Sequence, residues 1–184
     1  MTNKNLPTIK GIFVNSHIRA VKKTKGEAGI RKFQRMFGKS VNFRNTQDVP
    51  VRDEVKILEC AIKILYGDKI SKKDVAFEAG KLHFRDFATT PLAKIIFAVF
   101  KNNFKVMMIQ TEHIAGHVFQ RVQFQTQDLG ENAVRVVMKN NDYPLDHFRG
   151  LFQEWMDYMG CRGKVVAKNS SKNTYKYTMR WRKG

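Results

Sequence analysis

Residues 134–169 read VRVVMKNNDYPLDHFRGLFQEWMDYMGCRGKVVAKN, and the period of the apolar residues changes twice within this stretch. Val134, Val136 and Met138 occupy every second position, which is typical of a strand with one buried face. Apolar side chains then recur at helical spacing over 145–159, and Gly160 supplies a stop signal. Over 163–169 the spacing of the apolar residues again fits the two-residue period of a strand. The stretch therefore predicts a strand, a helix and a second strand. The apolar stripe of this helix comprises Leu145, Phe148, Leu151, Phe152, Trp155, Met156 and Met159.

Two further strands are predicted beside this core pattern. Residues 117–127 place Val118, Val122 and Phe124 on one face, and the turn 128–132 leads into the strand that begins the quoted stretch. The closing strand after residue 173 places Tyr175, Tyr177, Met179 and Trp181 on one face, with Thr174, Lys176, Thr178, Arg180 and Arg182 on the other. We interpret the aromatic face as core and the cationic face as solvent-exposed. The pattern predicts two hairpins joined by one helix.

The first hundred residues predict helices. Periodic apolar residues favour two helices that stop at Gly26 and Gly38, and a third over 49–67 with Asp53 and Glu54 in its first turn, where the helix dipole favours acids. Ser71 is expected to cap a fourth helix, and a fifth is expected over 89–100.

The fold class we expect is α+β in a single domain, residues 1–184. An N-terminal helical layer (1–103) packs on a late four-stranded antiparallel sheet (104–184), with the helix 145–159 crossing between the hairpins.

The net charge of +18 is concentrated at the two ends of the chain. Residues 1–50 hold eleven Lys and Arg against two acids, and residues 151–184 hold eight against two. Such a field attracts polyanions, although a generic basic surface would also produce it. The sequence contains no apolar stretch of bilayer length and no signal-peptide pattern, and its two cysteines form no disulfide framework, so we expect a cytoplasmic protein with no transmembrane segment.

The order of elements resembles a known superfamily. Residues 9–38 resemble the opening of heme-nitric-oxide/oxygen-binding (H-NOX) domains, which begin with a glycine, an amphipathic helix and a second helix after another glycine. Residues 134–181 are similar to 4-vinyl-reductase-type domains and to a related family of bacterial proteins. The matching landmarks are Gly11, Gly150, Cys161 and Trp181. The resemblance implies an H-NOX-like fold with a small-ligand pocket between the helices and the sheet.

Candidate pocket residues follow from that resemblance. We expect the lining to include Phe97, Phe100, Met107, Phe119 and Trp155, each of which could instead be a plain core residue. Heme-binding members carry a Tyr-x-Ser-x-Arg motif that holds the propionates, whereas the corresponding strand here reads VRVVMKNND. We therefore expect no heme and no other cofactor.

Other reactive side chains form no recognisable catalytic pattern. His113 and His117 could share a face but have no third ligand nearby, so we expect no metal site there. His83 is either a packing residue or an axial ligand, and Asp146 is expected to pair locally with His147 or Arg149. The sequence contains no glycine-rich phosphate loop, no nucleophile elbow and no carboxylate pair with a distinctive spacing, which argues against an enzyme.

Two sets of cations could bind an anion. Arg31 and Arg35 lie one helical turn apart, and the outer faces of the last two strands carry Lys164, Lys168, Lys176, Arg180 and Arg182. We expect a non-enzymatic sensory or regulatory module that binds a small molecule or an anionic ligand such as a nucleotide or a lipid. The alternative is a nucleic-acid-binding protein that uses the basic ends of the chain. An acidic protein or a second copy of the chain are further candidate partners.

Overall fold

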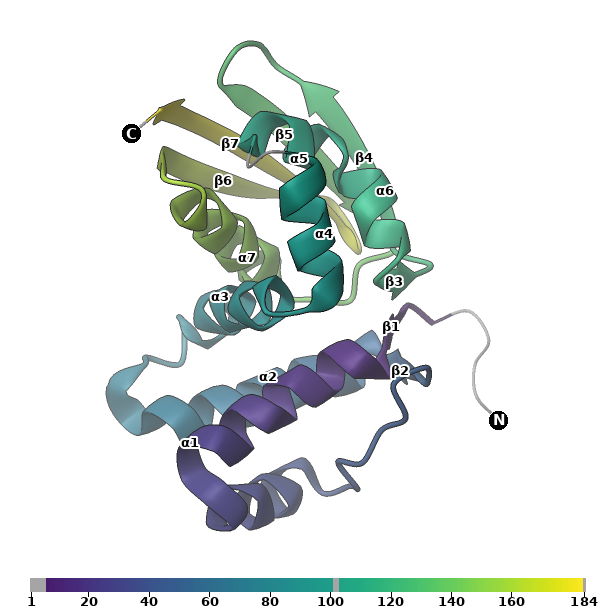
Figure 1. Cartoon of the computed structure of the whole chain (residues 1–184), viewed down its shortest axis with the longest axis vertical. Helices are drawn as coiled ribbons and strands as arrows, with labels where there is room; N and C mark the ends of the chain where they lie inside the picture. Colours follow the sequence, from purple (N-terminus) through teal and green to yellow (C-terminus); the bar gives the residue numbers. More distant parts are fainter. Residues whose placement is uncertain (1–5, 101–102, 184) are drawn as a thin grey trace.

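Helices dominate the first part of the chain and strands the second in the computed structural model, which describes residues 6–100 and 103–183 (Figure 1). The helices are α1 (Gly11–Phe37), α2 (Val51–Tyr66), the 3-10 turn η1 (Gly67–Lys69), α3 (Val75–Ala88), α4 (Pro91–Val99), α5 (Phe104–Ile109), α6 (Thr111–Gly116) and α7 (Leu145–Tyr158). The strands are β1 (Thr8–Lys10), β2 (Asp48–Pro50), β3 (Phe119–Gln120), β4 (Gln123–Asp128), β5 (Ala133–Lys139), β6 (Cys161–Ser171) and β7 (Thr174–Lys183). Within the described ranges, no helix combines the length and the apolar character needed to cross a bilayer.

The late part of the chain forms a four-stranded antiparallel sheet in the order β4-β5-β7-β6. Val136 on β5 lies opposite Tyr177 on β7, and Met179 lies opposite Val165 on β6. All four side chains are buried, because helices cover this face of the sheet. The predicted α+β class, with two hairpins joined by one helix, is confirmed.

The covered face of the sheet packs against α7 and α5. The ring centroid of Tyr177 lies 5.5 Å from that of Phe152 on α7. The ring centroid of Trp181 lies 4.9 Å from that of Phe104 on α5. Trp181 is only 7% exposed. The interpretation of the aromatic face of the last strand as core is therefore correct.

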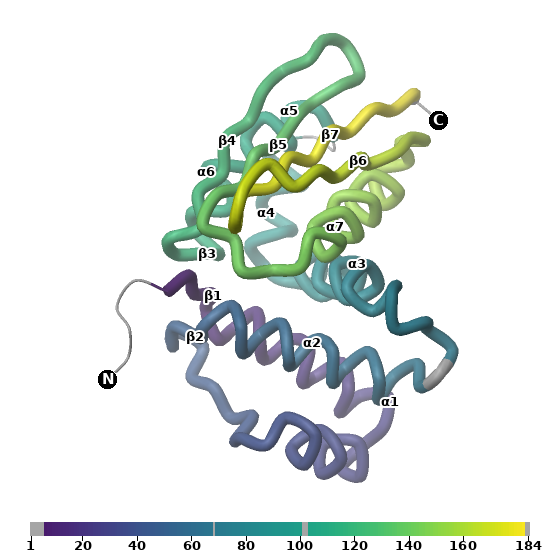
Figure 2. The backbone as a smooth tube through the Cα atoms, turned by 180° about the vertical axis from the view of Figure 1, so that it is seen from behind, coloured from purple at the N-terminus to yellow at the C-terminus, as the bar shows by residue number. Residues whose placement is uncertain are grey.

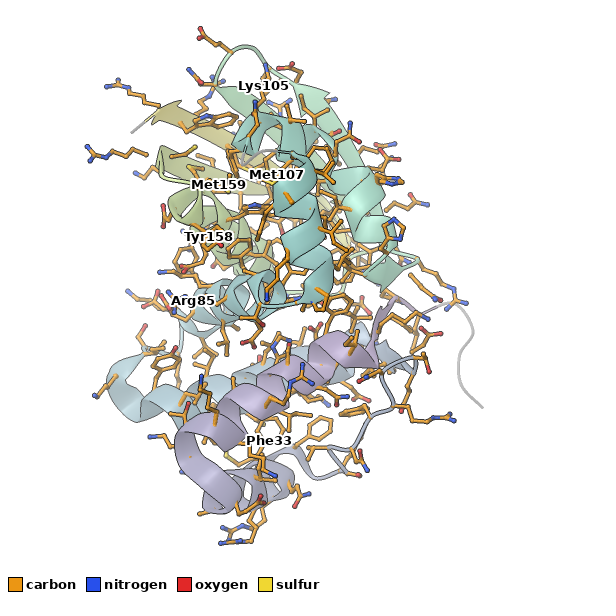
Figure 3. All side chains as sticks on the ribbon, viewed as in Figure 1. Phe33, Arg85, Lys105, Met107, Tyr158 and Met159 are labelled. Carbon is orange, nitrogen blue, oxygen red and sulfur yellow. The ribbon has the colours of Figure 1, made fainter. Side chains whose placement is uncertain are left out.

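The N-terminal helices form a layer on the far side of α3 from the sheet (Figures 1 and 2). The two helices predicted on either side of Gly26 are both present within α1, which is interrupted by a kink at that glycine, where the backbone is not helical (φ 62°, ψ -160°). Helix α2 runs alongside α1, and Phe33 is fully buried after the kink (Figure 3). Helix α3 contacts α1, α2 and α7, so it joins the N-terminal layer to the sheet half.

Three local expectations are wrong. Residues 104–116, assigned to the sheet half, form α5 and α6, because Asn103 caps α5 through its side chain and an apolar stripe continues at helical spacing. The strand expected over 117–127 is broken at Arg121, where φ is 67°, and β3 instead joins a separate three-stranded sheet in the order β2-β1-β3. Ser71 donates its hydroxyl to the Asp74 carboxylate (2.6 Å) instead of capping α3, which begins at Val75.

Two glycines allow α3 and α7 to cross in backbone contact. A Cβ on Gly80 of α3 would overlap the carbonyl oxygen of His147 on α7. A Cβ on Gly150 of α7 would overlap the carbonyl oxygen of Phe77 on α3. The bidentate pair of Arg85 with Glu154, with an Nε–Oε1 distance of 2.6 Å, joins the same two helices at the surface. The residue type at positions 80 and 150 therefore sets the distance between α3 and α7.

Replacement of Gly150 by Ala should push α3 and α7 apart. We expect the free energy of unfolding to fall by about 1–3 kcal/mol, as for an overpacked core, despite the helix-propensity gain of about 1 kcal/mol for Gly to Ala. Urea unfolding followed by circular dichroism measures the change. Gly116→Ala on α6 is the matched control, because its added Cβ meets no atom within 4 Å. Equal stability of the two variants would contradict the proposed contact.

Candidate functional site

A cavity of about 50 Å³ lies between α3, α6, α7 and the first strands of the sheet half. Its walls are almost entirely aliphatic and aromatic. The lining residues are His83, Phe84, Phe87, Thr111, Ile114, Ala115, Val118, Phe119, Phe124, Phe148, Leu151, Phe152 and Trp155. The cavity suits a small and mostly apolar molecule, since an engineered apolar cavity that binds benzene has a volume of about 150 Å³.

Two of the five predicted pocket residues line this cavity. Phe119 and Trp155 form part of its wall. Phe97 instead lines a surface hollow with Tyr158. Met107, labelled in Figure 3, is fully buried and Phe100 is half-buried, and neither residue lines the cavity. The pocket lies on the predicted side of the sheet, but it is formed by α3 and α6 rather than by α4 and α5.

Trp155, one of the residues of the cavity wall, carries an unpaired polar atom. Its side chain is 4% exposed, and its indole Nε1 is buried without a hydrogen-bond partner among the described residues. An unsatisfied buried donor costs about 1–3 kcal/mol. A ligand with a hydrogen-bond acceptor would remove this cost.

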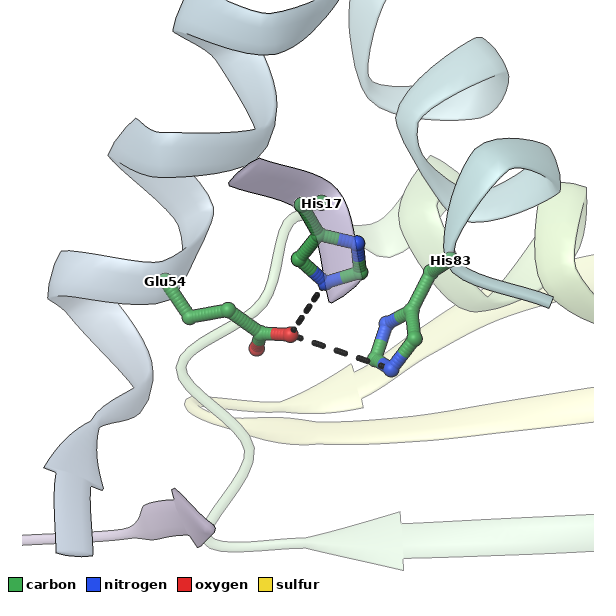
Figure 4. Close-up of side chains that lie close together, drawn as sticks. All are labelled: His17, Glu54 and His83. Carbon is green, nitrogen blue, oxygen red and sulfur yellow. Dashed lines mark hydrogen bonds and ion pairs between the residues drawn. The ribbon is translucent and has the colours of Figure 1, made fainter. Parts of the chain in front are cut away.

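His83 connects the cavity to a buried polar cluster, which consists of His17, Glu54, His83, Tyr143, His147 and Asp86. The Nε2 atom of His17 on α1 lies 3.2 Å from Glu54 Oε1 on α2, and the Nε2 atom of His83 on α3 lies 3.7 Å from the same oxygen (Figure 4). All three side chains are at most 4% exposed. These residues are brought together from three helices at the junction of the N-terminal layer with α3.

The remaining atoms of these side chains have partners of their own. His17 Nδ1 lies 2.6 Å from Asp86 Oδ2, and His83 Nδ1 lies 3.0 Å from His147 Nε2. The Tyr143 hydroxyl donates to Glu54 Oε2. The cluster therefore fixes the orientation of both imidazoles and of the carboxylate.

The imidazoles of the cluster differ in charge. Burial alone would lower the pKa of His17, but its hydrogen bonds to Asp86 and Glu54 raise that pKa to about 9. Burial lowers the pKa of His83 to about 4 and that of His147 well below its ordinary value. At neutral pH, His17 is therefore the cation of the cluster, while His83 and His147 are neutral.

Other predicted site residues lie outside the cavity and the cluster. His113 and His117 are exposed, with ring centroids 5.2 Å apart, and no third ligand joins them among the described residues. Arg149 Nε donates to Asp146 Oδ1 (2.6 Å), which confirms the local pair. His147, the other partner considered, points instead to His83.

The cations of the last two strands face solvent in three directly opposed pairs. The register places Arg162 opposite Arg182, Lys164 opposite Arg180, and Lys168 opposite Lys176. All six are exposed, and none forms an ion pair with an acid in the part of the chain that the structure describes. Like charges directly opposite each other destabilise a sheet. The outer face of β6 and β7 is therefore a surface that an anion would stabilise.

Arg31 and Arg35 are exposed on the last turns of α1, where they line an open hollow with Lys39. This end of α1 and the β6–β7 hairpin lie at different ends of the molecule in both backbone views (Figures 1 and 2). The two predicted anion-binding sets do not form one surface.

The sequence analysis missed His17 and Tyr143 and gave Glu54 only a helix-dipole role. The sequence pattern that could have revealed Glu54 as a buried residue is its helical spacing from two apolar residues of α2, Val51 and Leu58. His17 similarly lies between Val14 and Val21 on the buried side of α1. A polar residue on an apolar stripe indicates a buried polar site.

A heme does not fit the cavity. Its volume of about 50 Å³ is well below the roughly 300–1,000 Å³ of drug-sized ligand pockets. No Lys or Arg is among its lining residues to pair with propionates. The Nδ1 atom of His83, the one histidine in the wall, is bonded to His147, and its Nε2 faces Glu54.

Comparison with solved structures shows an H-NOX-like fold. An H-NOX protein from S. oneidensis in the Fe(II)NO state matches with a TM-score of 0.71 and 12% identity, covering 95% of this chain and 99% of that one. An oxygen-binding H-NOX domain related to soluble guanylate cyclases matches with a TM-score of 0.68 and 9% identity, covering 95% of each chain. A point mutant of an H-NOX protein from K. algicida, in the Fe(II) unliganded form, matches with a TM-score of 0.67 and 12% identity, covering 95% of this chain and 97% of that one.

The resemblance to H-NOX domains is therefore confirmed at the level of the fold. No curated protein matches this chain. A family model described as "Protein of unknown function (DUF2378)" matches residues 5–182. The chain belongs to that family, and within it has an H-NOX-like fold.

Proposed function

We propose that this protein is a non-enzymatic, heme-free sensor module that binds a small apolar molecule in the cavity between α3, α6 and α7. The observation that carries the proposal is the apolar cavity, whose wall includes Trp155, a residue with an unpaired buried indole N–H. The ligand has an apolar body of a few heavy atoms and one hydrogen-bond acceptor. Its binding would be read out through α3, which contacts the N-terminal layer as well as α7.

The chemistry of the described site supports binding over catalysis. Apart from His83 and Thr111, the cavity wall offers no titratable or nucleophilic side chain. The Thr111 hydroxyl donates to the Met107 carbonyl (3.4 Å). Apolar walls with one placed polar group are typical of a selective binding site.

The purified protein should show no Soret band, and stoichiometric hemin should keep the broad band of free hemin instead of giving the sharpened, shifted Soret band of a protein-bound heme. The cavity volume and the lack of a cation in its lining are the physical reasons. An absorption titration with hemin measures heme binding, and the His83→Asn variant is titrated in the same way for comparison. A stoichiometric Soret band that disappears in His83→Asn would contradict the heme-free proposal.

The cavity should bind xenon and acetonitrile, which are small enough to enter it. We expect both to shift the methyl NMR signals of Ile114 and Ala115, which line the wall. Trp155→Phe should weaken acetonitrile binding by about 2- to 10-fold, since one hydrogen bond contributes roughly 0.5–1.5 kcal/mol, and should not weaken xenon binding.

The Ala115→Leu variant tests whether xenon and acetonitrile bind in the cavity, because the larger side chain fills it. It should abolish binding of both probes. Ala98→Leu is the matched control, since Ala98 is exposed on α4. Equal probe affinity in the two variants would exclude the cavity as the binding site.

A second candidate function is nucleic-acid binding by the outer face of β6 and β7. Three like-charged cross-strand pairs without acidic partners in the described structure favour it. A row of phosphates would neutralise the repulsion within these pairs and release counterions. In this proposal the contacts between the cations and the phosphates position the protein on the nucleic acid without recognising its sequence, because they do not involve the base edges.

A triple variant, in which Ala replaces Lys176, Arg180 and Arg182, should bind duplex DNA more weakly, irrespective of the DNA sequence. The slope of log K against log salt should shrink by about 0.9 for each phosphate that the variant no longer neutralises, as measured by fluorescence anisotropy. The triple variant should keep or raise its melting temperature, because the like-charge pairs disappear. Trp181→Ala should instead lose about 3–5 kcal/mol of stability. An unchanged salt slope in the triple variant would refute this candidate.

A further inference from the structure

We propose that His17, Glu54 and His83 form a binding site for one divalent first-row transition-metal ion, of which Zn²⁺ and Co²⁺ are the probes. The site lies at the junction of α1, α2 and α3, and His83 is the residue that it shares with the cavity proposed for the small ligand. Two imidazoles and one carboxylate form a ligand set that Zn²⁺ and non-heme Fe²⁺ use in proteins.

The distances fit a metal ion. The three ligand atoms, His17 Nε2, Glu54 Oε1 and His83 Nε2, lie within 4.8 Å of one another. In a tetrahedral site with bonds of about 2.1 Å, neighbouring ligand atoms lie about 3.4 Å apart. The carboxylate oxygen is 3.2 Å from one imidazole nitrogen and 3.7 Å from the other. Small side-chain adjustments would place all three on one ion.

The outer partners of the ligands are those that a metal site requires. A metal-bound histidine usually donates its other N–H to a carboxylate or another acceptor. His17 Nδ1 faces Asp86 Oδ2 at 2.6 Å, so Nε2, which is directed at Glu54, is the nitrogen that faces the proposed ion. His83 Nδ1 faces His147 Nε2 at 3.0 Å, so a proton on Nδ1 leaves the His83 Nε2 lone pair available. Glu54 keeps its bond from Tyr143 through the other carboxylate oxygen.

The charge of the cluster also favours a divalent cation. Glu54 and Asp86 are two carboxylates that lie on either side of the His17 imidazole. Neither carboxylate pairs with a Lys or Arg among the described residues. A divalent ion at this position would balance both carboxylates, and an unbalanced buried charge is costly.

The histidine content of the chain allows a sharp experiment. The chain has five histidines: His17, His83 and His147 belong to the buried cluster, and His113 and His117 form the exposed pair. In a His113→Gln, His117→Gln background, every imidazole bound to a metal must therefore come from the cluster. The full-length protein with this background is treated with EDTA and titrated with Co²⁺ and Zn²⁺.

We expect one equivalent of Co²⁺ to give visible ligand-field bands, one equivalent of Zn²⁺ to abolish them, and the melting temperature to rise with Zn²⁺ concentration. His17→Asn and His83→Asn each keep an amide nitrogen near the Nδ1 position and remove the Nε2 ligand. Each should weaken binding by more than the roughly 10–100-fold typical of an outer-shell change, which is the effect expected for Asp86→Asn.

Circular dichroism verifies that each variant folds. If a variant fails to fold, X-ray absorption of the Zn²⁺-loaded background protein decides the question: two imidazoles and an oxygen ligand support the site, and a shell without imidazole overturns it. Binding that disappears in the His113→Gln, His117→Gln background, or that is unchanged in folded His17→Asn and His83→Asn, also overturns the proposal.

Discussion

The buried carboxylate of Glu54 constrains how three helices pack. A carboxylate removed from water is strongly destabilising unless it is paired and hydrogen-bonded. Glu54 on α2 obtains its partners from other elements: His17 on α1, His83 on α3, and Tyr143 in the segment before α7. A shift of α1 or α3 relative to α2 would break these contacts. The polar cluster therefore fixes relative helix positions that apolar packing alone would leave adjustable.

The contact between α3 and α7 sets both the cluster and the cavity. Because Gly80 and Gly150 let the two backbones touch, His83 comes within 3.0 Å of His147. The same crossing places Leu151 beside His83 in the cavity wall. A wider crossing would lengthen the imidazole contact and enlarge the cavity together, so two glycines control the geometry of both sites.

The sequence predicted the sheet and α7 because their apolar periods are unambiguous. It failed at α5 and α6, although Phe104, Met107 and Met108 follow helical spacing, because short helices resemble strands in so brief a window. The cluster was missed for another reason. The sequence analysis placed Glu54 only in the first turn of this helix, whereas Glu54 lies on the buried face of α2 with Val51 and Leu58. Its partners are also far away in sequence, and only the tertiary contacts bring them together.

The same fold can enclose different interiors, because about 10% identity to H-NOX structures leaves nearly every core side chain free to differ. Here the rings of Phe119, Phe124 and Phe148 pack within about 6 Å of one another and occupy much of the space between helices and sheet. What remains is a small cavity with His83 in its wall. Since the His83 ring also faces Glu54, any ligand that moves this ring changes the contacts of α2. By linkage, occupancy of the cavity and of the cluster must then influence each other's affinity.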